Sequence, residues 1–237
     1  MSVNLQSLSY SDSKTGNSLP YQLFVPDGCS LGGVCGLLLF LHGAGERGCD
    51  NQAQLRNDAL AFVDPVVQSR QPTIVVYPQC PEGMQWVDSN WEKPTYAIET
   101  TPASKPMTTV LALLEEICRD YSVDPRRILV TGLSMGGFGA WDLVLRHPLL
   151  FAAALPLCGG GDPTRAEKIR DLPLWAFHGD QDLAVPVAAT RSMIKAMRAV
   201  GGNPRYTEIA GGGHDVWTHA YRNPEVVGWL LSQSRQR

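Results

Sequence analysis

Gly132-Leu133-Ser134-Met135-Gly136 decides the fold of this chain, because it joins a strand pattern directly to a helix pattern. Residues Ile128 to Thr131 form a short apolar, uncharged run, which is typical of a strand buried on both faces of a parallel sheet. From Met135 to about His147, apolar residues recur at helical spacing. A strand that turns straight into a helix strains its apex residue, and glycines beside the apex allow the close packing required. The stretch therefore predicts that Ser134 is a nucleophile held above a helix N-terminus, whose N–H groups suit an oxyanion.

On both sides of this motif, strand and helix patterns alternate along the chain. An opening hairpin is expected first, followed by six strands that alternate with helical segments. The expected strands are Leu5–Tyr10, Leu19–Val25, Gly36–Leu41, Thr73–Tyr77, Ile128–Thr131, Phe151–Leu157, Leu174–Phe177 and Arg205–Ile209. The expected helices are a pattern within Asn51–Ser69 interrupted by Pro65, then Met107–Tyr121, the segment after Ser134, Val187–Val200 and Pro224–Gln233. Crossover helices imply a mostly parallel sheet of roughly eight strands with helices on both faces. We find no internal repeat or linker, so residues 1–237 are expected to form a single domain.

Composition excludes several classes of function. The 237 residues are 44% hydrophobic and 18% charged, which is enough apolar material for a large core. The net charge is −3 and no basic run is present, so neither nucleic acid nor an anionic membrane is an expected partner. The longest apolar run is far too short to span a bilayer.

The cysteines and the N-terminus bear on the compartment. Six cysteines are scattered without a C-x-x-C pair, so no metal cluster is expected. No nucleotide-binding loop or other cofactor motif is visible, so no cofactor is expected either. Residues 1–16 lack the apolar core of a signal peptide. We therefore expect free thiols and a cytoplasmic protein, or a secreted one if a signal has been removed.

A serine nucleophile needs a base, and the base needs a carboxylate that orients it. Both follow later strands of this chain, in the order acid and then histidine. The strand ending at Phe177 leads into His178-Gly-Asp-Gln-Asp-Leu-Ala-Val-Pro186, and the strand ending at Ile209 leads into Ala210-Gly-Gly-Gly-His214. The glycines before His214 would let a loop carry its imidazole to Ser134. The other histidines have structural interpretations: His147 ends a helix, His178 packs under its loop and His219 lies on a later helical turn.

The chain resembles the α/β-hydrolases of the carboxylesterase, feruloyl esterase and polyhydroxybutyrate-depolymerase-like group, some of which are called predicted peptidases. The resemblance runs from Leu39-Phe-Leu-His-Gly-Ala-Gly-Glu-Arg-Gly48 through Tyr77-Pro-Gln-Cys-Pro81, the Ser134 motif and the acid loop to His214. It covers nearly the whole chain. It implies the α/β-hydrolase fold and a serine hydrolase that needs no cofactor.

The resemblance also assigns roles to residues. The acid of the family's H-G-x-x-D-x-x-V-P loop corresponds to Asp182, so the implied triad is Ser134, Asp182 and His214. Asp180 is a rival that more readily caps its turn, and Asp162 is a second rival because some relatives carry the acid one strand earlier. The oxyanion hole would use the N–H groups of Met135 and Ala44, with Gly45 as the alternative to Ala44.

Three tryptophans are candidates for binding substrate. Trp86 and Trp91 lie in a polar connection, and Trp217 follows the predicted base by three residues. Such rings suit sugar faces, phenolic acids or acyl chains, although packing in the core or in a lid explains them equally well.

The prediction is therefore an esterase that cleaves small-molecule or carbohydrate-linked carboxylic esters through an acyl-enzyme. The alternatives are a peptidase of the same fold and a binding module without catalysis.

Overall fold

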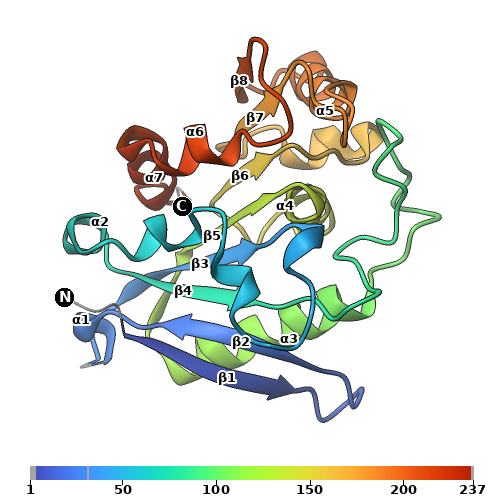
Figure 1. Ribbon diagram of the computed structural model, residues 1–237. Coiled ribbons are helices and arrows are strands. Elements are labelled where there is room, and N and C mark those ends of the chain that lie inside the picture. The colour runs from blue at the N-terminus through green and yellow to red at the C-terminus, as the bar shows by residue number, and fades with distance from the viewer. Residues whose placement is uncertain (1–3, 31, 236–237) are drawn as a thin grey trace.

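A single sheet organises the molecule, and it contains every strand of the described chain. The computed structural model describes residues 4–30 and 32–235. Along the sheet the strands follow the order β1-β2-β4-β3-β5-β6-β7-β8 (Figure 1). Their bounds are β1 Leu5–Ser11, β2 Ser18–Phe24, β3 Cys35–Leu41, β4 Thr73–Pro78, β5 Val123–Leu133, β6 Ala153–Leu157, β7 Trp175–Gly179 and β8 Arg205–Ile209. The predicted eight-stranded sheet is thus confirmed.

Strand direction follows from the connections. β1 and β2 form the expected antiparallel hairpin, and β2 also pairs antiparallel with β4. From β4 to β8 every neighbouring pair is parallel. All seven residues of β3 are buried, which is why this strand is a continuous apolar run rather than an alternating one. In a parallel sheet the carboxyl ends of the strands meet at one edge, where ligands bind in open α/β folds.

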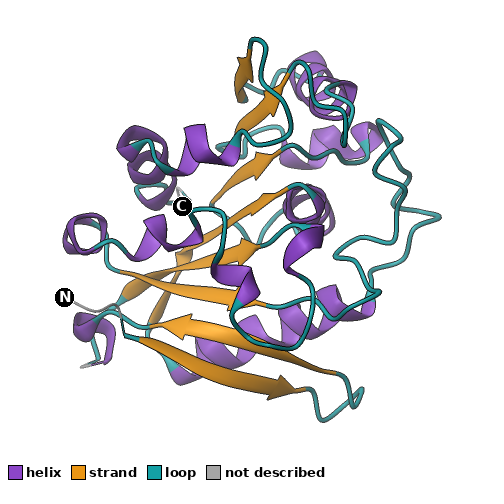
Figure 2. Cartoon of the chain, viewed as in Figure 1, coloured by secondary structure: helices purple, strands orange, loops and turns teal. Residues whose placement is uncertain are grey.

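Helices cover both faces of the sheet (Figure 2). The α-helices are α1 Asp27–Ser30, α2 Pro65–Arg70, α3 Lys105–Asp120, α4 Met135–Arg146, α5 Ala188–Ala199, α6 Trp217–Tyr221 and α7 Pro224–Leu231. The 3₁₀ turns are η1 Ala44–Glu46, η2 Ala53–Leu55, η3 Ala59–Val63 and η4 Pro163–Ile169. Helices α3, α4 and α5 share a core with alternate β3 residues such as Leu39. The intervening β3 residues, such as Phe40, pack with η3, α6 and α7 on the other face. Among the described residues no helix has the length and apolarity needed to cross a membrane.

The segment expected as an interrupted helix within Asn51–Ser69 differs from that expectation. It forms η2, η3 and then α2, and Pro65 begins α2 instead of breaking a longer helix. The carboxylate of Asp64 caps α2 by accepting hydrogen bonds from Val66 N and Val67 N. Proline suits this first position because its missing N–H would have no partner there. Helix α6 contains His219, which was expected to lie on a helical turn of unspecified bounds.

The prediction that all six cysteines are free thiols was wrong. Cys29 and Cys35 form a disulfide across the turn between α1 and β3, with 5.9 Å between their Cα atoms. The remaining four, Cys49, Cys80, Cys118 and Cys158, are free. The spacing of Cys29 and Cys35 did not signal this pair, because the return of the chain to begin β3 brings them together.

Candidate active site

Ser134, Asp182 and His214 lie at the carboxyl ends of three strands. Ser134 follows β5 directly, Asp182 lies in the loop after β7, and His214 lies in the loop after β8. β5 is central in the sheet, whereas β7 and β8 are the last two strands at one side. The order of the parallel strands therefore brings together residues that are 80 and 32 positions apart in sequence.

The turn at Ser134 has the strained geometry that its motif predicts. Ser134 has φ 54° and ψ −119°, a conformation that costs energy for a residue with a Cβ. Its N–H donates to Leu157 O at 2.9 Å, which fastens the apex to the neighbouring strand β6. A Cβ on Gly136 would lie 2.0 Å from Leu41 O, so only glycine lets the first turn of α4 approach β3 this closely. The sequence motif thus corresponds to a real packing constraint.

A continuous hydrogen-bond chain joins the three side chains. His214 Nε2 lies 2.8 Å from Ser134 Oγ, and His214 Nδ1 lies 2.6 Å from Asp182 Oδ2. The Asp182 side chain is fully buried, whereas 27% of the His214 side chain is exposed. This arrangement lets an imidazole accept the serine proton at one nitrogen while the carboxylate holds its other N–H.

The carboxylate of Asp182 is surrounded by donors. Oδ1 accepts from Ala184 N at 2.8 Å and from Val185 N at 2.9 Å. Oδ2 contacts His214 and also His178 Nε2, the latter at 3.2 Å. Burial by itself would raise the pKa of Asp182, but hydrogen bonds from His178, His214 and Val185 outweigh burial and hold that pKa well below its usual range. Asp182 is therefore ionised at neutral pH.

The two rival carboxylates are occupied elsewhere. Asp180 Oδ1 accepts from Gly211 N at 2.8 Å and so closes the gap between the acid and base loops. Asp162 is buried and caps η4 through Thr164, and its second oxygen accepts from Ile98 N at 2.8 Å. Burial opposes ionisation of Asp162, yet its hydrogen bonds with Thr164 and Ile98 lower its pKa overall. Neither carboxylate is hydrogen-bonded to His214.

Two elements beside the serine, α4 and η1, carry the candidate oxyanion donors. Met135 is the first residue of α4, and Ala44 is the first residue of η1. The η1 loop lies against the serine, since a Cβ on Gly43 would be 3.6 Å from Ser134 Cβ. Within the described chain no acceptor is hydrogen-bonded to the N–H of Met135, Ala44 or Gly45. These groups are available to an oxyanion, and Gly45 remains an alternative to Ala44.

The η1 loop is held by a buried histidine and by an arginine. His42 Nε2 accepts from Cys80 N at 2.9 Å, so its Nδ1 carries the proton and donates to Gly43 O at 2.6 Å. Burial lowers the pKa of His42 to about 4 and so keeps it neutral. Arg47 Nε donates to Ala44 O at 2.8 Å, which orients the peptide groups of the loop.

The tryptophans divide into three cases. Trp86, a candidate for binding substrate, is fully buried, and its Nε1 donates to His42 O at 3.0 Å. It instead ties the connection between β4 and α3 to the η1 loop. Trp91 is half-buried against a small cluster that includes Val185 of the acid loop. Trp217 is half-buried and stands edge-on to His214, with ring centroids 5.3 Å apart and planes at 90°. Of these three tryptophans, Trp217 is the one whose ring contacts a residue of the Ser134–His214–Asp182 hydrogen-bond chain.

The contribution of His178 was missed at the level of sequence. Its interpretation as a packing residue accounted for its burial but not for its contact with Asp182, which no local pattern signals. Donor atoms of Cys158, His178 and Asp182 lie within 4.8 Å of one another, a spacing that could hold a metal ion. Both oxygens of Asp182 and both nitrogens of His178 already have hydrogen-bonding partners, so we assign these residues to a hydrogen-bond network.

Curated proteins with similar sequences include a bifunctional esterase/xylanase and a depolymerase. The chain is 25% identical over 163 residues to the bifunctional acetylxylan esterase/xylanase XynS20E of Neocallimastix patriciarum, covering 68% of this chain and 21% of that protein. It is 32% identical over 87 residues to poly(3-hydroxyalkanoate) depolymerase C of Paucimonas lemoignei, covering 36% of this chain and 20% of that protein. The chain thus spans about a fifth of the length of these curated relatives.

Solved structures agree with this picture. A thermostable esterase superposes with a TM-score of 0.88 at 36% identity, covering 98% of this chain and 63% of that one. The feruloyl esterase module of Clostridium thermocellum, solved with sinapinate, has the same fold with a TM-score of 0.68 at 18% identity, covering 99% of this chain and 90% of that one. The family described as Phospholipase/Carboxylesterase matches residues 33–223. With its strained serine turn and its eight-stranded sheet, the chain belongs to the phospholipase/carboxylesterase family of α/β-hydrolases.

Proposed function

We propose that the chain hydrolyses carboxylic esters through an acyl-enzyme. The observation that carries the proposal is the continuous contact from Ser134 Oγ through His214 to Asp182, at 2.8 Å and 2.6 Å. Ser134 Oγ attacks the ester carbonyl carbon while His214 Nε2 takes its proton. The resulting imidazolium is stabilised by Asp182 and then gives the proton to the departing alcohol oxygen. Water attacks the acyl-enzyme by the same route in the second half of the reaction.

The developing negative charge on the carbonyl oxygen needs hydrogen-bond donors. We assign this role to the N–H groups of Met135 and Ala44, which begin the two elements beside the serine and have no acceptor within the described chain. The N-terminus of α4 adds the partial positive charge of a helix end. Donors that are already in place stabilise the transition state without reorganisation at the moment of reaction.

The substrate class follows from chemistry and from the relatives. An ester releases an alcohol more readily than a peptide releases an amine, and no contact in the site favours a peptidase. The relatives named above act on acetylxylan and on poly(3-hydroxyalkanoate), or carry a feruloyl esterase name. We therefore expect acyl or aryl esters, including carbohydrate-linked ones, with Trp217 beside the reacting group.

The disulfide bears on the compartment of the protein. A Cys29–Cys35 bond favours an oxidising environment over the cytoplasm expected from the sequence. Titration of thiols in the unfolded protein, with and without prior reduction, tests this directly. Four thiols before reduction and six after it would support the bond.

The proposed reaction is tested by covalent labelling. A fluorophosphonate should modify the wild type stoichiometrically, whereas Ser134→Ala should not be labelled and should lose about 10⁴-fold in kcat on a p-nitrophenyl ester. Ser192→Ala is the control, because Ser192 lies on α5 and its hydroxyl donates to Ala188 O, outside the site. Hydrolysis at the wild-type rate by Ser134→Ala would overturn the proposal.

A further inference from the structure

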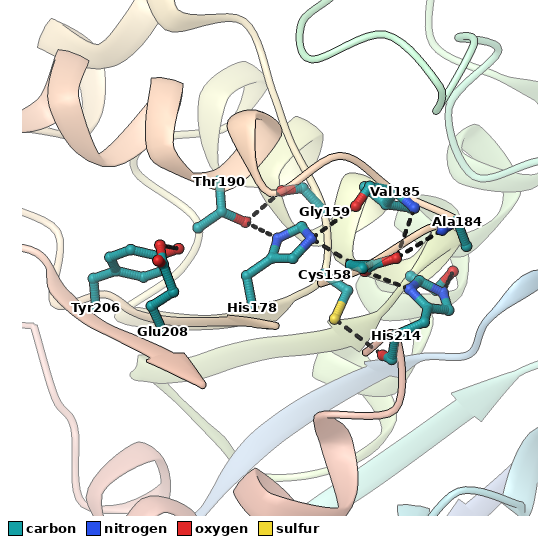
Figure 3. Close-up of polar contacts among 11 residues, drawn as sticks. Cys158, Gly159, His178, Ala184, Val185, Thr190, Tyr206, Glu208 and His214 are labelled. Carbon is teal, nitrogen blue, oxygen red and sulfur yellow. Dashed lines mark hydrogen bonds and ion pairs between the residues drawn. The ribbon is translucent and has the colours of Figure 1, made fainter. Parts of the chain in front are cut away.

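His178 is a fully buried histidine whose two ring nitrogens both face hydrogen-bonding partners (Figure 3). Nδ1 lies 2.7 Å from Thr190 Oγ1 on α5. Nε2 lies 3.0 Å from Val185 O and 3.2 Å from Asp182 Oδ2. The polarity of these partners decides how many protons the ring carries.

Nε2 must carry a proton. Both oxygens that it faces, a main-chain carbonyl and an ionised carboxylate, can only accept a hydrogen bond. A bare nitrogen lone pair in this position would be repelled by both oxygens in a place that water does not reach.

The protonation of Nδ1 is decided by the hydroxyl of Thr190. A hydroxyl has one proton, and Thr190 Oγ1 lies 2.7 Å from Gly159 O, which has no proton to offer (Figure 3). The proton of Thr190 therefore lies on the bond to Gly159 O. The contact between Thr190 and Nδ1 then needs a proton from the ring, so Nδ1 donates.

We propose that His178 is a buried imidazolium, protonated at both nitrogens at neutral pH, that acts as a second histidine on the acid of the catalytic triad. It is a positioning residue, because it acts on the reaction only through Asp182 and His214. The consequence for the reaction rests on the ester hydrolase proposed above, whereas the charge of the ring does not.

The surrounding charges favour a cation at this position. Asp182 faces the ring from its own loop. Glu208 is the β8 partner of His178 in the sheet register and points to the same face. Glu208 is paired with Arg191 of α5 at 2.6 Å. Glu208 thus has a cation of its own, whereas Asp182 has no arginine or lysine partner within the described chain and is hydrogen-bonded to the two imidazoles and to main-chain N–H groups.

The other titratable groups around the ring are neutral or belong to the triad. Tyr206 donates to Glu208 at 2.6 Å, and burial together with that carboxylate raises its pKa. The Cys158 thiol donates to His214 O at 3.3 Å, and burial raises its pKa also (Figure 3). His214 touches the same oxygen of Asp182 as His178 does.

His42 provides an internal contrast. It is also buried, but its Nε2 accepts a hydrogen bond from the main-chain N–H of Cys80, so this ring carries a single proton. Among the partners of His178 no group donates to the ring. The two buried histidines of the site therefore differ in charge because their partners differ in polarity.

A charged His178 changes the strength of the base. Both imidazoles contact Asp182 Oδ2, at 3.2 Å and 2.6 Å, so a proton added to His214 would meet a positive charge close by. That repulsion disfavours protonated His214 and keeps it available as a base at more acidic pH. The two rings contact one carboxylate oxygen, so the repulsion acts over a short distance and is partly screened by solvent at His214.

The charge is tested first without substrate. Nitrogen-15 spectra of histidine-labelled protein at pH 7 should show one imidazole with both nitrogens protonated, and this signal should be absent from His178→Gln. Because this measurement needs no turnover, it remains informative even if the chain does not hydrolyse esters. A neutral His178, with one bare nitrogen at pH 7, would overturn the proposal.

The effect on the base is tested by pH profiles. Glutamine keeps a donor toward Asp182 without the charge, so His178→Gln should move the acid limb of kcat/KM upward by about one pH unit. When each protein's activity at pH 5 is divided by its own plateau value, the variant should retain about tenfold less than the wild type. Thr190→Val should move the limb in the same direction, since it removes the acceptor of Nδ1, whereas Thr190→Ser should keep the wild-type limb.

A purely structural role would lower stability or the plateau rate without moving the limb. If neither His178→Gln nor Thr190→Val shifts it, the proposed electrostatic role is wrong. If His178→Gln fails to fold, the Thr190 pair and the wild-type spectrum still decide the question.

Discussion

Replacing Asp182 with asparagine tests the site most sharply, because the substitution changes one atom. In the wild type, Oδ1 accepts two main-chain N–H groups and Oδ2 accepts from His214 Nδ1 at 2.6 Å. The asparagine carbonyl should stay at the Oδ1 position, since Ala184 N and Val185 N both need an acceptor. Its NH₂ group then faces His214 Nδ1, and two donors cannot pair. The imidazole is expected to move its proton to Nε2, which can no longer accept the proton of Ser134.

The size of the effect follows from what is lost. The variant loses the charge that stabilises the imidazolium and also presents the wrong tautomer to the serine. An asparagine in place of the triad aspartate of a serine protease lowers kcat by about 10⁴ for the same reason, and we expect a loss of that order here. At about 1.4 kcal/mol per factor of ten, this corresponds to roughly 5.5 kcal/mol of transition-state stabilisation.

The assay compares three aspartates. Initial rates with p-nitrophenyl acetate and rates of fluorophosphonate labelling are measured for Asp182→Asn, Asp180→Asn and Asp162→Asn, alongside urea unfolding. Asp180→Asn should keep kcat within about threefold, because a carbonyl oxygen can still accept from Gly211 N. Asp162→Asn should lose about 1–3 kcal/mol of stability but remain active, since its partners are Thr164 and Ile98.

One outcome would refute the assignment of the acid. If Asp182→Asn retains kcat within tenfold of the wild type while folded Asp162→Asn is inactive, the acid belongs to the loop after β6 and the contact between His214 and Asp182 is not functional.

Three further predictions concern packing, substrate and pH. Gly136→Ala should lower the free energy of unfolding by about 3 kcal/mol, because its Cβ would meet Leu41 O at 2.0 Å. Gly228→Ala in α7, where no atom lies within 4 Å of the added Cβ, should instead stabilise the protein by about 0.5–1 kcal/mol. Equal effects of the two substitutions in urea unfolding would contradict this. Trp217→Ala should raise KM for aryl or sugar esters about fivefold, because roughly 1 kcal/mol of ring contact is lost, and should change KM for p-nitrophenyl acetate little. An equal loss of activity on both kinds of substrate would assign Trp217 to packing alone. The pKa of Asp182 is lower in the folded than in the unfolded chain, so its ionisation stabilises the fold above about pH 4 and that stability is lost on acidification. Asp182→Asn should therefore lose less stability than the wild type between pH 5 and pH 3. Parallel losses of stability in the two proteins would argue against an ionised carboxylate.

Features that depend on neighbours in sequence were predictable. The turn at Ser134 could be located because a buried strand, a small-residue apex and an amphipathic helix follow one another within about twenty residues. The alternation of strands and helices likewise determined a mostly parallel sheet, whose carboxyl edge had to gather the residues that follow β5, β7 and β8. Ser134, Asp182 and His214 could therefore be proposed together before any distance was known.

Features that depend on what packs across the molecule were decided by the tertiary structure alone. Trp86 sits in a polar stretch but is fully buried, because the connection between β4 and α3 folds back onto His42 O. The pairing of Cys29 with Cys35 required the path of the chain into β3. The charge that we assign to His178 depends on Val185 and Asp182 of the loop after β7 and on Thr190 of α5, whose own proton is held by the remote carbonyl of Gly159. A sequence pattern records which residue types are present, but the protonation of a buried group is set by the polarity of the atoms that surround it.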